Sequence, residues 1–240
     1  MRAVGIMTHG GPEALEVLEV PDQEAGEGQI RIRNFAASVN PVDVSVRNGS
    51  MAEMQKINPP PYVPGMDAAG VIDQIGDDVE TDLKVGDSVM AMVVPNGIHG
   101  AYKEHIVLDK NAVVRAPKET SHIQASTLPM NSLTARLSLN LLGLNKGQVL
   151  AVTGGPGAYG GFVIQLAKAD GLTVIADSKE SDRDLLESLG VDIIIPRGEG
   201  FAERVREEFP NGVDGIADGA LLNESAIEAV KDGGSFTSVR

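Results

Sequence analysis

The stretch QVLAVTGGPGAYGGFVIQLAKA, residues 148–169, decides the fold of this chain. It begins with a short apolar run, typical of a strand buried on both faces, and ends with an apolar helical pattern. Between them, Gly155, Gly157 and Gly160 fit the pattern G-x-G-x-x-G. The first glycine permits a sharp turn, the second a close approach of the backbone to a pyrophosphate, and the third close packing of helix on strand. This context predicts a dinucleotide-binding loop, and a glycine-rich turn without a ligand is the alternative.

The residues that open the predicted helix belong to the same candidate site. Ala158, Tyr159 and Gly160 lie where unpaired N–H groups and the positive end of the helix dipole favour phosphate. The Tyr159 side chain can pack against protein or touch the pyrophosphate, and we favour packing. We therefore count all three residues as candidate cofactor-binding residues.

The two halves of the sequence follow different patterns. From about residue 121, strand patterns alternate with helical patterns, which predicts a parallel, doubly wound sheet of the α/β class. Residues 1 to about 120 instead contain short, partly alternating strands between clusters of Gly, Pro, Asp and Asn, which indicates a β-rich domain. The candidate strands of the second half are residues 148–153, 172–176, 191–195, 213–218 and 235–240.

The residues that follow the second of these strands bear on the choice of cofactor. Asp177 ends the run LTVIAD, about 20 residues after the glycine loop. An acid at this point binds the ribose 2′-hydroxyl of NAD, whereas the nearby cations Lys179 and Arg183 suit the 2′-phosphate of NADP, unless they are ordinary surface charges. Spacing alone leaves NAD and NADP open.

Composition excludes several classes of function. The 240 residues carry a formal net charge of −14 without a Lys/Arg-rich run, so we expect no nucleic-acid and no membrane partner. Cys is absent, which excludes disulfides and thiolate-bound metals, and the four His residues have no metal-ligand spacing,. Neither a signal peptide nor an apolar run of about 18 residues is found. We therefore expect a soluble, cytoplasmic protein.

Six motifs resemble, in their order along the chain, those of a known family. The chain is similar over essentially its whole length to the medium-chain dehydrogenases/reductases, and within them to the zinc-independent, quinone-oxidoreductase-like branch. The resemblance implies a GroES-like β-rich catalytic domain at residues 1–122 and a Rossmann dinucleotide-binding domain at residues 123–240. The motifs are ASVNPVDVSVRNG (37–49), VPGMDAAGVIDQIGDDV (63–79), KVGDSV (84–89), GAYKEHIVLD (100–109), LPMNSLTA (128–135) and VTGGPGAYGGFVIQLAKADG (152–171).

The resemblance also implies an activity and its residues. It implies an oxidoreductase that transfers a hydride from NADPH to a quinone or to an activated alkene such as an enone. The family places two residues near the nicotinamide, which here are Asn40 and Thr134, and Ser45 stands where many relatives have a Tyr. These three are the catalytic candidates, and Asn40 and Thr134 are also cofactor-binding candidates. Ser178 aligns with the acid of NAD-preferring enzymes, so this small residue followed by Lys179 favours NADPH over NADH.

Zinc-dependent members of the family differ from this chain at their metal ligands. They carry a Cys near Val39 and a His at the position of Met66, and neither is present. We therefore expect no zinc and no other metal, and a carbonyl group would have to be polarised by hydrogen bonds. Asp67 replaces the more usual Glu of its motif, and we expect it to be buried and hydrogen-bonded.

The resemblance bears finally on the end of the chain and on its partners. Family members continue to a sixth strand and then return to the catalytic domain, so we expect the Rossmann sheet to be C-terminally incomplete. Because an unfinished sheet has an open edge, we expect a homodimer or a higher homo-oligomer, with a small-molecule substrate. A non-catalytic NADPH-binding sensor or scaffold protein is the alternative to an enzyme.

Overall fold

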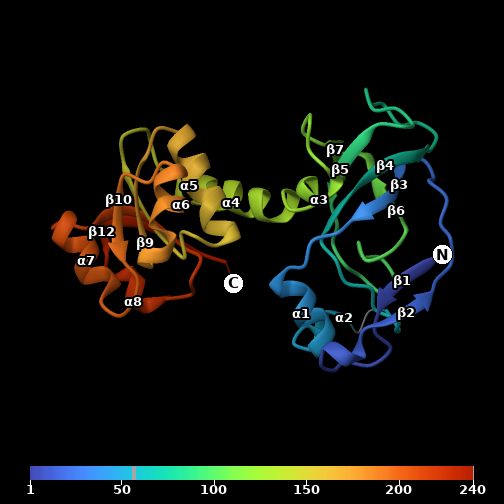
Figure 1. Cartoon of the computed structure of the whole chain (residues 1–240), viewed down its shortest axis with the longest axis horizontal. Coiled ribbons are helices and arrows are strands. Elements are labelled where there is room, and N and C mark those ends of the chain that lie inside the picture. Colours follow the sequence, from blue (N-terminus) through green and yellow to red (C-terminus); the bar gives the residue numbers. More distant parts are fainter. Residues whose placement is uncertain (56–57, 240) are drawn as a thin grey trace. The chain divides into compact units, whose positions relative to one another are not determined.

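The computed structural model describes residues 1–55 and 58–239, and the chain divides into two compact units, Met1–Met130 and Asn131–Arg240. Figure 1 shows a mostly β unit and an α/β unit. The predicted combination of a β-rich fold and a parallel α/β sheet is confirmed, while the domain boundary that we placed between residues 122 and 123 stays a prediction. None of the described helices is long and apolar enough to cross a membrane.

The first unit is organised around an antiparallel sheet of five strands. Side chains on one face of this sheet, among them Ile30, Ile32 and Val89, are fully buried and form its core. This alternation of buried and exposed positions is typical of an antiparallel sheet with one face toward a core. The strands are β3 (Gln29–Ala36), β4 (Asp67–Ile75), β5 (Ser88–Met92), β6 (His105–Asp109) and β7 (Val113–Arg115), in the order β6-β3-β4-β5-β7.

Shorter elements surround this sheet, and one of them positions a predicted site residue. Helix α1 begins at Pro41, whose fixed φ suits the first helical position, and ends before Gly49, which has φ 85°. Asn40 lies just before the helix and is only 4% exposed. The shorter elements are β1 (Arg2–Gly5), β2 (Glu16–Glu19), α1 (Pro41–Asn48), α2 (Ala52–Gln55), α3 (His122–Ala125), and the 3-10 turns η1 (Pro12–Ala14) and η2 (Lys110–Ala112).

A lysine with uncharged partners is buried in the first unit. Lys103 is 6% exposed, and its Nζ donates to Gln23 Oε1 at 3.1 Å and to the Ile98 carbonyl oxygen at 3.3 Å. Burial lowers the pKa of Lys103 to about 8, because the charged ammonium loses more hydration than the neutral amine does. The folded state therefore disfavours the charged form of this side chain.

We expect Lys103→Met to raise the free energy of unfolding by about 1 kcal/mol at pH 7. Between the folded pKa of about 8 and the unfolded value of 10.5, the unfolded chain binds more protons, so the contribution of Lys103 to stability rises with pH. The variant should lose that rise. Urea unfolding followed by circular dichroism at pH 7 and pH 10 measures both effects, and an unchanged pH slope in the variant would contradict the prediction.

The second unit is a parallel five-stranded sheet between helices. Helix α4 (Pro129–Leu142) leads into this unit. The strands are β8 (Val149–Thr153), β9 (Thr173–Ser178), β10 (Ile193–Pro196), β11 (Val213–Asp218) and β12 (Val230–Ser238), in the order β10-β9-β8-β11-β12. The connecting elements are α5 (Ala158–Ala169), η3 (Glu180–Asp182), α6 (Arg183–Ser188), α7 (Phe201–Glu208) and α8 (Glu224–Ile227).

Helices cover both faces of this sheet, as Figure 1 shows. Leu150 and Val152 of β8 pack in a core with α5 and α6, whereas Ala151 between them packs in a second core with α7 and α8. A strand buried on both faces needs apolar side chains at every position, which explains the continuous run VLAV. The prediction that this run forms a strand buried on both faces is therefore confirmed.

The strand order reverses beside β8, and this reversal positions the site. From β8 the chain passes outward through β9 and β10, and then crosses to β11 on the other side of β8. In open parallel sheets, ligands bind outside the carboxyl ends of the strands at such a reversal. Each predicted strand overlaps an observed one. The last observed strand, β12, begins at Val230, earlier than predicted, and it continues through an irregularity in its pairing with β11, where Gly233 has φ 76°. Arg240 lies outside the described residues.

Candidate functional site

The glycine loop joins β8 to α5 at the reversal point. Gly154 has φ 67°, a left-handed conformation that favours glycine,, and its carbonyl oxygen accepts the Gly157 N–H at 2.9 Å. Gly157 precedes the first helical residue, Ala158. Because Gly157 has no side chain to cap the helix, the first-turn N–H groups of α5 are available to an anion.

The predicted glycines differ in how little space they leave for a side chain. A Cβ at Gly160 would lie in forbidden contact with the Gly154 carbonyl oxygen and 2.9 Å from Gly155 Cα. At Gly155 it would lie 3.2 Å from the Ala176 and Leu186 side chains. The Gly160 position thus lets helix α5 pack closely on the loop, which is the role that the pattern assigns to the third glycine.

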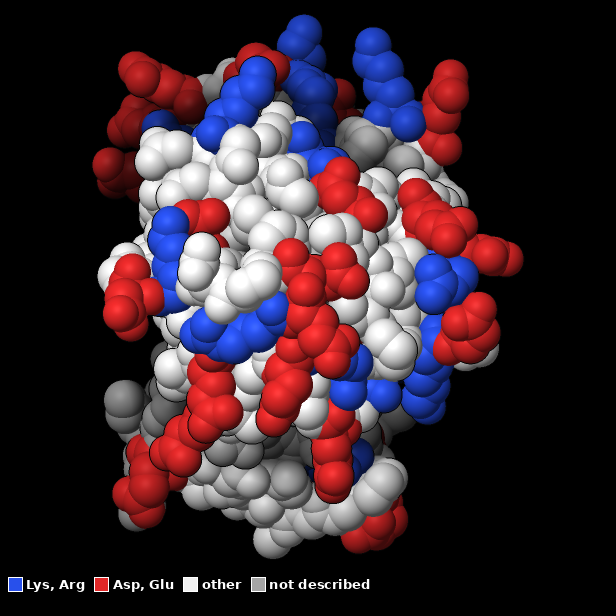
Figure 2. Space-filling view, turned by 90° about the vertical axis from the view of Figure 1, so that its left-hand side faces the viewer, with Lys and Arg blue, Asp and Glu red and all other residues white. Residues whose placement is uncertain are grey.

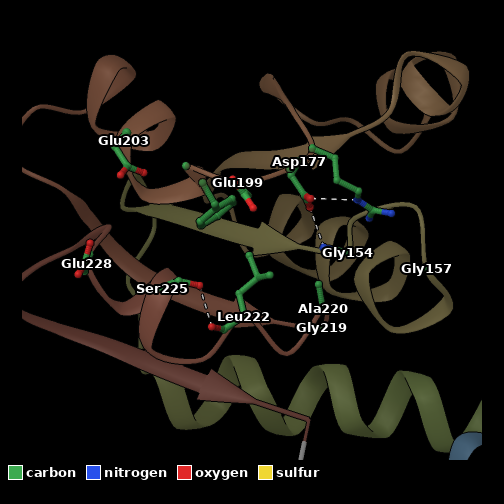
Figure 3. Close-up of a pocket in the computed structure, with 14 residues that line it drawn as sticks. Gly154, Gly157, Asp177, Glu199, Glu203, Gly219, Ala220, Leu222, Ser225 and Glu228 are labelled. Atoms are coloured by element: carbon green, nitrogen blue, oxygen red, sulfur yellow. Dashed lines mark hydrogen bonds and ion pairs between the residues drawn. The ribbon is translucent and has the colours of Figure 1, made fainter.

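Asp177, near the end of β9, is hydrogen-bonded both to the glycine loop and to Arg197, which follows β10. Its side chain is 5% exposed. One carboxylate oxygen accepts the Gly154 N–H at 2.7 Å, and the other accepts Arg197 Nε at 3.1 Å. Figure 3 shows the carboxylate of Asp177 directed toward Gly154, at the end of its strand. The acid predicted from spacing therefore lies beside the loop, and it is already paired with a cation.

A cavity of about 670 Å³ opens beside Asp177. It is bounded by the loop that follows β8, by Asp177 near the end of β9, and by the segments that follow β10 and β11, so it lies at the carboxyl ends of four strands (Figure 3). This volume is in the range of cofactor and ligand pockets. Its lining residues are Gly154, Gly157, Asp177, Arg197, Gly198, Glu199, Gly200, Phe201, Glu203, Gly219, Ala220, Leu222, Ser225 and Glu228.

The cavity has an acidic lining. Glu199, Glu203 and Glu228 join Asp177 in it, and among its described lining residues Arg197 is the one cation. Figure 2 shows Asp and Glu side chains spread over the face of the protein that it views, with Lys and Arg among them. An anionic ligand in the cavity therefore has one guanidinium to pair with.

The other candidates for cofactor selection lie outside this lining. Ser178 is 4% exposed, and its hydroxyl donates to the Lys179 carbonyl oxygen at 2.7 Å. The Lys179 side chain is exposed. Arg183 forms ion pairs with Glu180 at 3.2 Å and Glu187 at 3.8 Å. Arg183 therefore interacts with acids of its own helical segment.

The side chain of Tyr159 packs within the second unit. Its hydroxyl donates to Ser138 Oγ at 2.8 Å, and its ring lies so close to Gly219 that a Cβ there would be 2.8 Å from Tyr159 Cδ1. Burial raises the pKa of the Tyr159 hydroxyl, so this group stays protonated and donates. Tyr159 can thus offer its backbone N–H, rather than its ring, to a ligand at the start of α5.

A second polar cluster, in the first unit, surrounds Asn40. Its side-chain amide donates to Asp67 Oδ2 at 2.7 Å and to Ser38 Oγ at 3.0 Å. Asp67 is fully buried, and its other oxygen accepts the Met130 N–H at 2.6 Å. The expectation that Asp67 is buried and hydrogen-bonded is confirmed. Because both described bonds of the Asn40 amide nitrogen are to these neighbours, the orientation of this side chain is fixed.

The buried carboxylate of Asp43 is hydrogen-bonded to the backbone beside this cluster. Asp43 accepts the N–H groups of Asn40 and Gly65, each at 2.8 Å, and the Tyr102 hydroxyl at 3.2 Å. Burial raises the pKa of Asp43, and these N–H donors oppose the rise. Burial, together with the nearby Asp43, also raises the pKa of Tyr102. Tyr102 is therefore a donor to Asp43 over the physiological pH range.

The two remaining catalytic candidates lie on helices. Ser45 of α1 is half-buried, and its hydroxyl is 3.4 Å from the Pro41 carbonyl oxygen of the preceding turn. Thr134 is half-buried on α4. Asn40 and Ser45 belong to the first unit and Thr134 to the second, so their roles stay predictions. Among the described residues, no cluster of three His, Asp or Glu side chains is arranged to hold a metal ion.

Several lining residues were missed by sequence reasoning. Gly154 makes the left-handed turn, one residue before the pattern that we recognised. Arg197 directly follows β10, and Gly219 and Ala220 directly follow β11. The available signal was their position after buried parallel strands, because the carboxyl ends of such strands meet at one edge.

Two family descriptions match the chain. The alcohol dehydrogenase GroES-like domain matches residues 26–118, and the zinc-binding dehydrogenase domain matches residues 158–239. This pair, in this order, is the domain arrangement that the six motifs predicted. The chain belongs to the medium-chain dehydrogenase/reductase family.

Relatives in this family have related activities in their names. A 2-methylene-furan-3-one reductase from Solanum lycopersicum is 33% identical over 98% of this chain and 61% of its own length. A chloroplastic NADPH-dependent alkenal/one oxidoreductase from Arabidopsis thaliana is 30% identical over 100% of this chain and 62% of its own length. The chain thus spans less than two thirds of the length of these medium-chain dehydrogenases/reductases.

Solved structures of the family have the same fold. A quinone oxidoreductase from Coxiella burnetii is 29% identical, with a TM-score of 0.84, over 99% of this chain and 75% of that chain. A structure described as an NAD-dependent alcohol dehydrogenase is 30% identical, with a TM-score of 0.87, over 99% of this chain and 77% of that chain. The relatives named above and the Coxiella protein place this medium-chain dehydrogenase/reductase in the quinone-oxidoreductase-like branch.

Proposed function

We propose that this chain belongs to an NADPH-dependent oxidoreductase that reduces a quinone or an activated alkene such as an enone. The observation that carries the proposal is the loop of residues 154–160, which has glycine at positions 154, 155, 157 and 160 and borders a cavity at the strand reversal. A dinucleotide needs this arrangement, because its pyrophosphate approaches the backbone more closely than a Cβ allows. The cofactor choice follows the small Ser178 and the NADPH-dependent relative from Arabidopsis.

The residues of the second unit fit such a cofactor. The N–H groups of Ala158, Tyr159 and Gly160 would hold the pyrophosphate at the start of α5. Asp177 and Arg197, at the ends of β9 and β10, would hold the adenosine ribose and its substituent. When bound, the reduced nicotinamide supplies the hydride. The side chain of Tyr159 acts indirectly, because its bond to Ser138 fixes the first turn of α5.

The proposed acceptor is a carbonyl compound with a conjugated double bond. Methylene-furanones, alkenals, enones and quinones, which the names of the relatives contain, share this group. Its reduction places negative charge on oxygen, which hydrogen-bond donors stabilise. We assign Asn40 to positioning of the cofactor or substrate, with Asp67 fixing its amide, and Thr134 and Ser45 to hydroxyl donors. Asp43 accepts the backbone N–H of Asn40 and the hydroxyl of Tyr102, and it thereby holds the backbone at Asn40 in place.

Titration of NADPH and NADH into the purified chain, followed by nucleotide fluorescence, tests the proposal. The absence of Trp keeps the protein background low. We expect NADPH to bind more tightly than NADH, and quinones or enones to oxidise it in the presence of the protein. Tight binding without turnover on a broad panel of quinones and enones would favour a sensor or scaffold instead. Binding of neither nucleotide to the folded chain would contradict the proposal.

Three further predictions belong to this proposal. Independence of zinc is testable by metal analysis of purified protein, and rests on the absence of Cys and on Met66 at the position of a zinc-ligating His. The other two predictions are a cytoplasmic location and a homo-oligomeric state. Size-exclusion chromatography with light scattering measures the latter directly.

A further inference from the structure

We infer that Arg197 selects the cofactor, by neutralising Asp177 and offering its remaining N–H groups to the 2′-phosphate of NADPH. The inference rests on the proposed function, and it assigns the selection to a residue that directly follows β10 rather than to the cations that follow β9 in sequence. An acid at the end of the second strand normally binds a 2′-hydroxyl and repels a phosphate. Asp177 has this position, so NADPH binding requires that its charge be compensated.

The geometry provides this compensation from the neighbouring strand. In the parallel pairing of β9 with β10, Ile195 lies opposite Asp177 and Pro196 opposite Ser178. The next residue, Arg197, is held by its backbone N–H, which donates to the Ser178 carbonyl oxygen at 2.8 Å. Its Nε donates to Asp177 at 3.1 Å. The backbone pairing therefore fixes the guanidinium beside the carboxylate.

The outer edge of the guanidinium is free for a ligand. The Arg197 side chain is 36% exposed and lines the cavity. Within residues 1–55 and 58–239, its hydrogen bond to Asp177 uses Nε, and neither terminal nitrogen has a partner. A guanidinium presents its N–H groups in a planar fork that matches phosphate oxygens. Arg197 can thus pair with Asp177 on one side and with a phosphate on the other.

The remaining charges of the cavity make the cofactor choice depend on this one residue. Without Arg197, the described charged residues of the lining are Asp177, Glu199, Glu203 and Glu228, all of them acidic. Such a lining would repel a dianionic 2′-phosphate, and it would leave Asp177 free to accept from a 2′-hydroxyl. Arg183 lies outside this lining, where it pairs with Glu180 and Glu187.

Dissociation constants of NADPH and NADH for the 240-residue chain and its variants test the inference. We expect Arg197→Met to weaken NADPH binding on the order of 10- to 100-fold, the effect of a lost charge-assisted hydrogen bond. NADH binding should change less than about threefold or improve. Asp177→Asn should weaken NADH and leave NADPH equal or tighter. Arg197→Lys, which keeps the charge, should retain a preference for NADPH.

Matched variants separate this role from a structural one. Arg136→Met removes a similar Arg–Asp pair, with Asp170, outside the cavity lining and should change neither constant. Equal weakening of NADPH and NADH in Arg197→Met, with an unchanged melting temperature, would overturn the inference. Loss of NADPH preference in Lys179→Met or Arg183→Met, but not in Arg197→Met, would also overturn it. If the wild-type chain binds neither nucleotide, the proposed function itself fails, which is a distinguishable result.

Discussion

Gly160→Ala should weaken NADPH binding on the order of 100-fold, because the loop backbone that approaches the pyrophosphate must shift. The added methyl group would lie in forbidden contact with the Gly154 carbonyl oxygen and 2.9 Å from Gly155 Cα. Both contacts are with backbone, which cannot rotate away as a side chain can. The loop must therefore move, and with it the N–H group that Asp177 accepts from Gly154.

The neighbouring glycine provides the control for this prediction. A Cβ at Gly161 would be 3.6 Å from Leu189 Cδ1, an ordinary van der Waals contact. Gly161→Ala should leave NADPH binding within about twofold and stabilise α5 by up to about 1 kcal/mol, since Ala favours helix. Gly160→Ala should instead destabilise the chain by about 1–3 kcal/mol through overpacking. Nucleotide fluorescence and thermal unfolding measure the two effects, and identical behaviour of the two variants would refute the close-packing role of Gly160.

The glycine loop was predictable because its constraint is local. A strand, a turn and the start of a helix lie within the contiguous residues 148–169, and each has its own pattern of residue types. The acid at Asp177 was predictable for a related reason, since one helix and one short turn separate it from the loop. In both cases the residues of the site belong to one continuous βαβ segment, so their spacing in sequence indicates which of them lie close together in space.

Arg197 could not be predicted in this way, because strand register brings it to the site. It lies 20 residues after Asp177, and its place depends on which residues of β9 and β10 pair. Arg183 is closer in sequence, but local geometry directs it to Glu180 and Glu187. Sequence reasoning did not single out Arg197, whereas the structure pairs it with Asp177. The sheet register, which is a property of the whole unit, determines which cation meets the acid.

The same limit applies to the cluster around Asn40. Sequence reasoning placed Asn40 near the cofactor by resemblance and expected Asp67 to be buried, but it did not join the two. The structure joins them through a hydrogen bond of 2.7 Å between residues 27 positions apart. The partner of a buried polar group is set by tertiary packing, while its need for a partner follows from burial alone.

Asp67→Ala should destabilise the first unit by about 2–4 kcal/mol and reduce turnover by more than it reduces NADPH affinity. Asp67 is fully buried and accepts from Ser38, Asn40 and the Met130 N–H. Removing the carboxylate takes away the acceptor that these three donors share, and a donor that water cannot reach then costs about 1–3 kcal/mol. The Asn40 amide would also lose the bond that fixes its orientation.

Two variants distinguish lost orientation from general destabilisation. Asp67→Asn keeps one acceptor oxygen, so it should lose about half as much stability as Asp67→Ala, yet its NH₂ group would face the Asn40 amide and disturb its orientation. Asp82→Asn removes a carboxylate that is 87% exposed, and should change stability by less than about 0.5 kcal/mol. Urea unfolding gives the stabilities, and kcat with the best acceptor gives the functional effect. If Asp67→Asn kept full kcat, the cluster would support only the fold of the first unit, because an amide that is free to reorient would then be as effective as a fixed one.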